Sequence, residues 1–209
     1  MRILIADDHS VVRQGLKQVL AAEFKQAVFG EACTGQQAID LAWKEPWDVL
    51  VLDITMPGQN GLDVLKAIKK TRPKLPVLML SMHPEDQFAV RMLKIGASGY
   101  MTKESAPAEL VGAVKKVVSG GRYVSPALAE KMASYLAMDV QSSPHERLSD
   151  REFLVLRLIA SGKTVGEIAR ELSLSVKTVS TYRTRIIEKT GLRNNSELTH
   201  YAIQNKLVG

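Results

Sequence analysis

The chain has 209 residues, which is enough for two ordinary domains. Its hydrophobic content of 45% and charged content of 24% are those of a globular protein. No apolar run approaches the roughly 18 residues of a membrane span, and Ile3–Ala6 leads at once into Asp7 and Asp8, unlike a signal peptide. The single cysteine, Cys33, allows no internal disulfide and fits a reducing compartment. We therefore expect a cytoplasmic protein without membrane contact.

The net charge of +6 is unevenly distributed. Residues 145–209 carry 11 Lys and Arg against 7 Asp and Glu, whereas residues 1–144 carry 17 against 15. The excess of positive charge per residue is therefore larger in the carboxy-terminal part. This mildly favours a polyanionic partner there, although a solvated surface rich in lysine explains the same count.

Residues 1–122 alternate short apolar runs with segments of helical periodicity. The runs are rich in Val, Leu and Ile, as is typical of parallel strands that are buried on both faces. Strands are expected at Arg2–Ala6, Val28–Ala32, Val49–Asp53, Val77–Leu80 and Ser98–Thr102. Helices are expected from His9, over Gly35–Trp43, from Gly61, from Pro84 to Leu93, and from about Pro107 to Ser119. This order predicts an α/β, doubly wound, five-stranded parallel sheet with right-handed crossovers, the flavodoxin-like arrangement.

Polar and charged side chains stand where four of the expected strands end. They are Asp7 and Asp8, Asp53, Ser81 and Lys103. The carboxyl ends of parallel strands meet at one edge of a sheet, and carboxylates gathered there favour a hard cation such as Mg²⁺. A carboxylate beside Mg²⁺ can attack phosphorus, while the metal, a lysine and a hydroxyl counter the charge of the phosphoryl oxygens. The alternative is a set of unrelated helix caps and surface charges.

Four motifs in residues 1–122 resemble the receiver domain of two-component response regulators. They are Ile5–His9, Leu52–Gly58 with Gly61 after it, Leu80–Ser81, and Gly99–Lys103. The resemblance implies that Asp53 accepts a phosphoryl group from a phosphohistidine. It also implies that Asp7, Asp8, Asp53 and the backbone carbonyl of Thr55 hold Mg²⁺.

The same resemblance implies a switch behind the phosphorylated aspartate. Ser81 would move toward the phosphoryl group, Tyr100 would turn inward behind it, and Lys103 would pair with the phosphate. Ser81 replaces the commoner Thr of the family, which keeps the hydroxyl and removes the methyl group that biases its rotamer. Glu104 stands where many receivers have Pro. Taken without the family, Tyr100 is typical of an ordinary packed strand face.

Residues 123–145 predict a linker that contains one amphipathic helix. Ser125 has the form of an N-cap and Pro126 of a first helical residue. Leu128, Met132, Tyr135 and Leu136 share one helical face, and Gln141–Pro144 reads as a flexible connection.

Residues 146–209 predict four helices. Ser149 with Glu152, and Thr164 with Glu167, have the spacing of capping boxes. Ser175 is expected to cap a longer basic helix over Val176–Thr190, and a last helix is expected at Ser196–Asn205. A short helix, a tight turn and a longer basic helix form a helix-turn-helix, whose second helix can enter the major groove of DNA. Plain bundle packing is the alternative.

This part resembles the LuxR-type DNA-binding domain, and the two resemblances together give the layout of the NarL/FixJ class. The motifs are Leu148–Glu152, Ile159–Lys163, Glu167–Ala169, Leu172–Ser180 and Lys189–Leu192. Candidate DNA contacts lie on the longer helix. They are Lys177, Thr178, Ser180, Thr181, Arg183, Thr184, Arg185 and Lys189.

The function implied is phosphorylation-controlled regulation of transcription, without enzymatic turnover beyond phosphoryl transfer to Asp53 and its hydrolysis. The implied partners are a sensor histidine kinase or a phosphotransfer protein, double-stranded promoter DNA, a second copy of the chain on that DNA, and RNA polymerase. An aspartate-nucleophile phosphatase is one alternative, but its second Asp would stand at Thr55. A degenerate receiver that works without phosphate is the other, and the complete set of acids, hydroxyl and lysine speaks against it.

Overall fold

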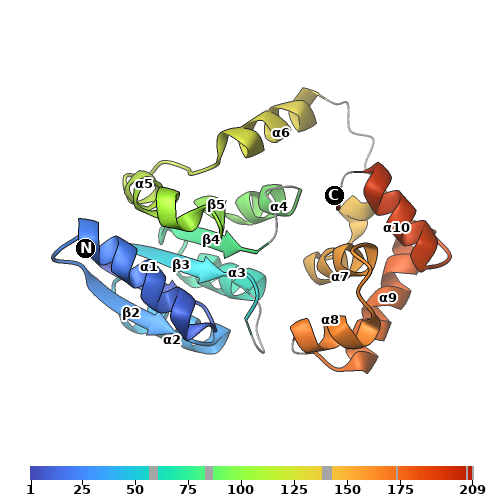
Figure 1. The fold of residues 1–209 in the computed structure, drawn as a ribbon, viewed down its shortest axis with the longest axis horizontal. Coiled ribbons are helices and arrows are strands. Elements are labelled where there is room, and N and C mark those ends of the chain that lie inside the picture. Colours follow the sequence, from blue (N-terminus) through green and yellow to red (C-terminus); the bar gives the residue numbers. More distant parts are fainter. Residues whose placement is uncertain (57–60, 83–86, 138–142, 173, 206, 209) are drawn as a thin grey trace. The chain divides into compact units, whose positions relative to one another are not determined.

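The computed structural model describes residues 1–56, 61–82, 87–137, 143–172, 174–205 and 207–208 (Figure 1). The chain divides into two compact units, Met1–Ala133 and Ser134–Gly209. This division falls inside the segment 123–145 that the sequence predicts as a linker. Pro57, Gly58, Pro84 and Gln141, which figure in the predictions above, lie outside the described residues.

The first unit is built on a single five-stranded parallel sheet. Its strands are β1 (Arg2–Ala6), β2 (Val28–Ala32), β3 (Val49–Asp53), β4 (Val77–Ser81) and β5 (Gly99–Thr102). Their order in the sheet is β2-β1-β3-β4-β5, and every neighbouring pair is parallel. The predicted flavodoxin-like fold is confirmed. β3 lies at the centre, and all five of its residues are buried because helices cover both of its faces.

Helices cover both faces of the sheet (Figure 1). They are α1 (Ser10–Glu23), α2 (Gly35–Lys44), α3 (Gly61–Thr71), α4 (Gln87–Ile95) and α5 (Ala106–Val118). α1 packs beside α5, while α2 packs beside α3 and α3 beside α4. The core between the sheet and the first pair includes Ile3, Leu20, Val51, Leu80 and Val114, all fully buried. This core fixes the strands, and therefore the side chains that follow them.

The segment after α5 contains α6 (Pro126–Ala137), followed by a 3₁₀ turn, η1 (Pro144–Arg147). The Ser125 hydroxyl accepts a hydrogen bond from the Leu128 amide, as the predicted N-cap requires. On the predicted apolar face Leu128 is fully buried and Met132 is half-buried. The side chains of Tyr135 and Leu136 lie outside the described residues.

The second unit is helical, as predicted. It holds α7 (Asp150–Ala160), α8 (Val165–Glu171), α9 (Val176–Thr190) and α10 (Asn195–Gln204). Both predicted capping boxes form, one at the start of α7 and one at the start of α8. Ser175 caps α9, and Gly191 ends it in the left-handed conformation with φ of 73°. In the described part of the chain no helix combines the length and apolar character that crossing a membrane requires.

Candidate functional site

The carboxyl edge of the sheet brings Asp7, Asp53 and Lys103 into direct contact. The Lys103 ammonium lies 2.6 Å from Asp7 Oδ2 and 2.8 Å from Asp53 Oδ2. Asp7 follows β1, Asp53 ends β3 and Lys103 follows β5, so parallel strands carry all three to one place. Asp7 and Asp53 are 0% and 1% exposed. Two buried carboxylates therefore share one lysine.

The backbone of Asp53 is held by the start of α3. The Gly61 amide donates to the Ile54 carbonyl at 2.8 Å. A Cβ on Gly61 would meet the Asp53 carbonyl oxygen at 2.1 Å and the Ile54 Cα at 2.8 Å. The Thr55 amide in turn donates to Asp53 Oδ1 at 3.2 Å. Glycine is required at position 61 because the helix begins directly against the backbone of Asp53.

The acidic cluster extends to Asp8 and His9. The His9 amide donates to Asp7 Oδ1 at 2.8 Å, and the His9 ring nitrogen Nδ1 lies 2.8 Å from Asp8 Oδ1. One ligand atom from each of Asp7, Asp8, His9 and Asp53 can be chosen so that all four lie within 4.8 Å of one another. These residues, and the carboxylates above all, are placed to share one ion.

The chemistry of this cluster fits a hard divalent cation. Asp7 Oδ2, Asp8 Oδ1 and Asp53 Oδ2 are buried and accept no hydrogen bond of normal geometry within the described residues. The Lys103 ammonium pairs with Asp7 and Asp53, and the His9 ring nitrogen Nδ1 lies beside Asp8. Three neighbouring carboxylates with one ammonium group beside them leave an excess of negative charge, which is costly where water is largely excluded, and a cation ligated by oxygen offsets that cost.

Burial and charge set the protonation of the central pair. Burial, with repulsion from Asp7, raises the pKa of Asp53 to about 6, although the attraction of Lys103 lowers it. Burial alone would lower the pKa of Lys103, but its attraction to Asp53 and Asp7 prevails and the pKa lies above its ordinary value. At neutral pH Asp53 is therefore mainly an anion, and Lys103 is a cation.

Ser81 lies at this edge of the sheet, at the end of β4, and Tyr100 lies within the sheet, on β5. Ser81 is 1% exposed and ends β4, where it pairs in register with Thr102. Its carbonyl accepts a hydrogen bond from the Lys103 amide at 2.7 Å, so the backbone joins the ends of β4 and β5. Tyr100 is fully buried on β5. The backbone thus links the serine directly to the lysine of the cluster.

Sequence reasoning gave no role to His9, and it treated Gly61 as a helix start and as part of the receiver motif, without a reason for glycine there. His9 directly follows Asp8 in the sequence. The contact of its ring with Asp8 depends on the conformation of the short connection between β1 and α1. The close approach of Gly61 to Asp53 depends on the entry angle of α3, which no local pattern specifies. Arg13 was also missed; its guanidinium donates to the Asp7 carbonyl at 2.8 Å and thereby tethers α1 to the end of β1.

In the second unit, α8, a short turn and α9 form the helix-turn-helix. α8 packs against α9, and Val179 and Ile186 point from α9 into the core. Lys177, Ser180, Thr181, Thr184 and Arg185 are exposed on its other side. This is the amphipathic arrangement that a recognition helix requires.

The four cationic side chains of α9 differ in whether they bind another residue of the domain. Lys177 and Arg185 make no ion pair or side-chain hydrogen bond with any described residue. Arg183 instead donates to the Asn195 side chain at 2.6 Å, and Lys189 pairs with the buried Glu152 at 2.6 Å. The first two cations are free for an outside anion, whereas the other two bind α9 to its neighbours.

The hydroxyl groups of α9 are partly used as well. Thr181 and Thr184 donate to the carbonyls of Lys177 and Ser180, one turn earlier. The Thr178 hydroxyl contacts Ser175 at 2.7 Å within the cap. Each of these oxygens keeps acceptor capacity toward a base edge.

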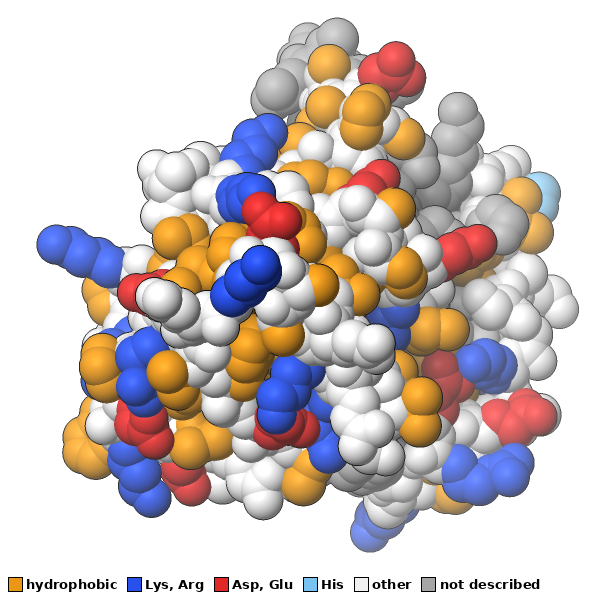
Figure 2. All heavy atoms as spheres, turned by 60° about the vertical axis from the view of Figure 1, so that its left-hand side comes forward, with side chains coloured by type: hydrophobic (Ala, Val, Ile, Leu, Met, Phe, Trp, Pro, Cys, Tyr) orange, Lys and Arg blue, Asp and Glu red, His pale blue; other side chains and the backbone are white. Residues whose placement is uncertain are grey.

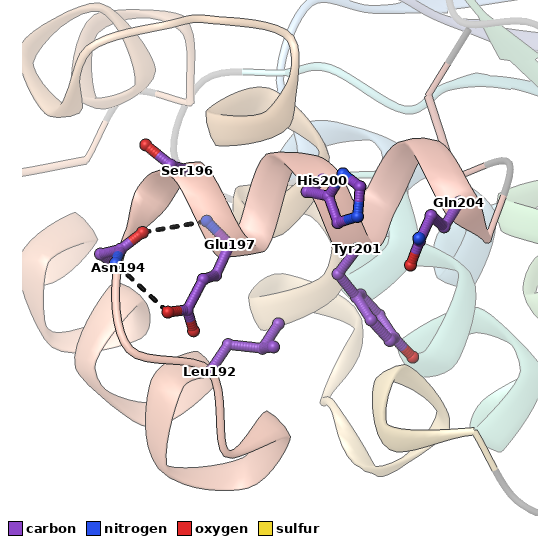
Figure 3. Close-up of a pocket in the computed structure, with 7 residues that line it drawn as sticks. All are labelled: Leu192, Asn194, Ser196, Glu197, His200, Tyr201 and Gln204. Carbon is purple, nitrogen blue, oxygen red and sulfur yellow. Dashed lines mark hydrogen bonds between the residues drawn. The ribbon is translucent and has the colours of Figure 1, made fainter.

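A separate hollow of about 390 Å³ lies along α10 (Figure 3). Asn194 and Glu197 line it and bond to each other as the cap of α10. Ser196 points away from Glu197 and His200 in this view, so these residues form no hydroxyl, imidazole and carboxylate relay (Figure 3). The hollow has no hydrolytic site of that kind.

Comparison with known proteins agrees with this geometry. A family model described as a response regulator receiver domain matches residues 3–115, and one described as bacterial regulatory proteins of the luxR family matches residues 146–202. Response regulator UvrY of Escherichia coli K12 is 36% identical over 208 residues, covering 99% of this chain and 95% of UvrY. Response regulator GacA of Pseudomonas aeruginosa PAO1 is 36% identical over 209 residues, covering 100% and 98%.

Solved structures give the same likeness. RcsB of Salmonella enterica serovar Typhimurium, bound to promoter rprA in the presence of the phosphomimetic BeF3⁻, has a TM-score of 0.65 and 29% identity, covering 96% of this chain and 97% of RcsB. A structure described as the RcsB–DNA complex has a TM-score of 0.60 and 29% identity over 96% of each chain.

A doubly wound domain with an acidic cluster around Asp53, joined to a helix-turn-helix, defines a response regulator that acts on transcription through DNA. The chain belongs to the NarL/FixJ class of response regulators, with a receiver domain and a LuxR-type DNA-binding domain.

Proposed function

We propose that Asp53 accepts a phosphoryl group from a phosphohistidine on a sensor kinase or phosphotransfer protein, and that this event controls DNA binding. The observation that carries the proposal is the contact of buried Asp53 with Lys103 inside the acidic cluster. In the transfer, an Asp53 carboxylate oxygen forms a bond to phosphorus while the bond from phosphorus to the histidine nitrogen breaks. The pKa of about 6 leaves Asp53 ionised at neutral pH, as a nucleophile must be.

Asp7, Asp8, Asp53 and the Thr55 carbonyl would hold Mg²⁺ in this reaction. When bound, Mg²⁺ supplies positive charge to the phosphoryl oxygens. Lys103, already 2.8 Å from Asp53, would pair with one of those oxygens. The donor set supports Mg²⁺ because three of the four ligands are carboxylates and the fourth is a carbonyl, all of them hard oxygen ligands.

The phosphoryl group would act on the fold through Ser81 and Tyr100. Ser81 would donate to a phosphoryl oxygen, and its backbone bond to Lys103 would carry the movement into β5. Tyr100 lies on that strand and would follow the rearrangement. The negative charge and acceptor oxygens of the phosphoryl group would thereby shift the equilibrium between two arrangements of Ser81 and Tyr100.

The output would be promoter binding through α9. Lys177 and Arg185 would contact phosphates, and Ser180, Thr181 and Thr184 would face base edges. A homodimer would read two half-sites about one helical turn apart and could engage RNA polymerase beside the site. The DNA-bound structures of RcsB, a protein that shares both domains, support this assignment.

DNA binding by the wild type and Asp53→Ala tests the proposal. Both proteins are measured with Mg²⁺, before and after a small-molecule phosphodonor. A gain in affinity confined to the wild type is expected. Equal binding by both proteins with and without donor would show that the DNA-binding half acts alone.

A further inference from the structure

A second polar pocket lies at the end of the sheet opposite to Asp53. It has a volume of about 340 Å³ and opens at the amino ends of β4 and β5. The end of α3, the loops that enter these two strands, and the residues after α5 form its wall. This end of the receiver, on the left in Figure 1, is turned forward in Figure 2, where Lys and Arg side chains stand out on the surface. None of the residues assigned above to phosphorylation or DNA binding belongs to it.

Three cationic side chains line this pocket: Lys69, Lys74 and Arg122. No Asp or Glu is among its lining residues. Lys74 and Arg122 are exposed and make no ion pair or hydrogen bond with any residue that the structure describes. This contrasts with other cations of the unit, such as Lys17 and Lys115, which pair with Glu31 and Glu23.

Lys69 is the inner member of the three. Its ammonium donates to the Leu75 carbonyl at 2.7 Å and to the Pro73 carbonyl at 3.4 Å, which leaves one of its three hydrogens free. Burial and the positive charge of Arg122 lower the pKa of Lys69. The carbonyl contacts fix Lys69 at the wall while its charge remains unneutralised.

Ser98 adds a neutral donor at the floor. Its hydroxyl oxygen accepts a hydrogen bond from the Val77 amide at 3.3 Å, so the hydroxyl hydrogen remains available. The Ser98 amide itself is used, because it donates to the Val77 carbonyl at 2.8 Å. The free donors of the pocket are thus two ammonium groups, a guanidinium and a hydroxyl, and all of them suit phosphate oxygens.

We propose that this pocket binds a small, freely diffusing polyanion that carries phosphate groups. Its volume lies near the lower end of the range for small-molecule sites, roughly 300–1,000 Å³, and three cations match a ligand with several negative charges. Duplex DNA is a poorer match, because its phosphates are contacted by side chains that project from a convex element rather than line a hollow. The site takes no part in phosphoryl transfer to Asp53.

Calorimetric titration of the full chain with inorganic triphosphate tests this site. Divalent cations are first removed with a chelating resin, so that the Asp53 cluster cannot bind the probe through a metal. Saturable binding of one triphosphate per chain is expected at near-physiological salt. Lys74→Ala and Arg122→Ala should each weaken it by about tenfold, the usual effect of removing one charge-assisted hydrogen bond.

Two controls separate this site from general charge effects. Lys25→Ala removes the same charge from an exposed position before β2, at the far edge of the sheet, and should change the affinity less than twofold. A Lys177→Ala and Arg185→Ala double variant removes the free cations of α9 and should also leave triphosphate binding intact. Unchanged melting temperatures for the two pocket variants would show that they fold.

The proposal is overturned if the wild type shows no saturable binding, or if the pocket variants bind as tightly as the wild type. It is equally overturned if Lys25→Ala or the α9 double variant weakens triphosphate binding as much as Lys74→Ala and Arg122→Ala do. Co-sedimentation with vesicles that contain a phosphorylated inositol lipid, in the absence of triphosphate binding, would assign the pocket to a membrane headgroup instead.

Discussion

Gly61 leaves no room for a side chain against Asp53, because a Cβ would lie 2.1 Å from the Asp53 carbonyl oxygen. Gly61→Ala must therefore move either α3 or the end of β3. We expect the free energy of unfolding to fall by about 1–3 kcal/mol, as for other overpacked sites. Phosphorylation of Asp53 should also slow, because its carboxylate is displaced from Lys103. Chemical denaturation and the rate of phosphorylation by a small phosphodonor measure the two effects.

Gly15→Ala is the matched control. Gly15 lies within α1, and a Cβ there would meet nothing within 4 Å. Alanine should stabilise the helix by about 0.5–1 kcal/mol and leave phosphorylation unchanged. Similar losses in both variants would show that the short contact at Gly61 has no effect on its own.

Asp53 makes stability depend on pH in the absence of divalent ions. Its pKa of about 6 in the folded state lies above the roughly 3.9 of an unfolded aspartate, so the folded state binds the proton more tightly. The contribution of Asp53 is therefore most favourable below about pH 4 and is lost as the pH rises through 6. Asp53→Asn should be more stable than the wild type at pH 7, by about 1–3 kcal/mol, and this difference should vanish toward pH 4. A difference that does not change with pH would contradict the raised pKa.

Mg²⁺ should stabilise the wild type by binding the folded state. Asp8→Asn removes a carboxylate from the cluster, so the rise in melting temperature with Mg²⁺ should be smaller and should need more Mg²⁺. Asp40→Asn, at an exposed position on α2, should respond like the wild type. An equal response of Asp8→Asn and the wild type would remove Asp8 from the metal site.

The sheet could be predicted from the sequence, because each strand is a short apolar run and each crossover helix has a clear helical periodicity. It also placed Asp53 and Lys103 together, since parallel strands all end at one edge. The role of Gly61 and the ring contact of His9 with Asp8 could not be predicted, because they depend on the angles at which helices meet strands. Likewise, the side-chain pattern of α9 marked Arg183 and Lys189 as equivalent to Lys177. Only the tertiary structure shows that Asn195 and Glu152 bind them.

Lys177→Ala and Arg185→Ala should weaken promoter binding without loss of stability. Each removes one exposed cation that has no partner in the described domain. For each DNA phosphate that a variant no longer neutralises, the slope of log affinity against log salt should flatten by about 0.9. DNA titrations over a range of salt concentrations measure this slope. Unchanged affinity for both variants would remove α9 from the DNA interface.

Lys189→Ala should instead reduce stability and leave DNA binding almost unchanged, because Lys189 pairs with Glu152 at 2.6 Å. Glu152 is 2% exposed, and its carboxylate also accepts from the Ser149 amide in the α7 capping box. Removing the lysine should lower the free energy of unfolding by about 1 kcal/mol, with little change in the salt dependence of DNA binding.

The pH dependence distinguishes this ion pair from a general loss of packing. Although burial alone would raise it, the pKa of Glu152 lies below its ordinary value because Lys189 and Ser149 stabilise the carboxylate. A depressed acid pKa gives stability that is present above about pH 4.3 and is lost as the pH falls through the folded pKa. The difference between the wild type and Lys189→Ala should therefore shrink on acidification below that value. A difference that does not shrink on acidification would contradict the ion pair, and a flattening of the salt dependence equal to that of Lys177→Ala would assign Lys189 to the DNA interface.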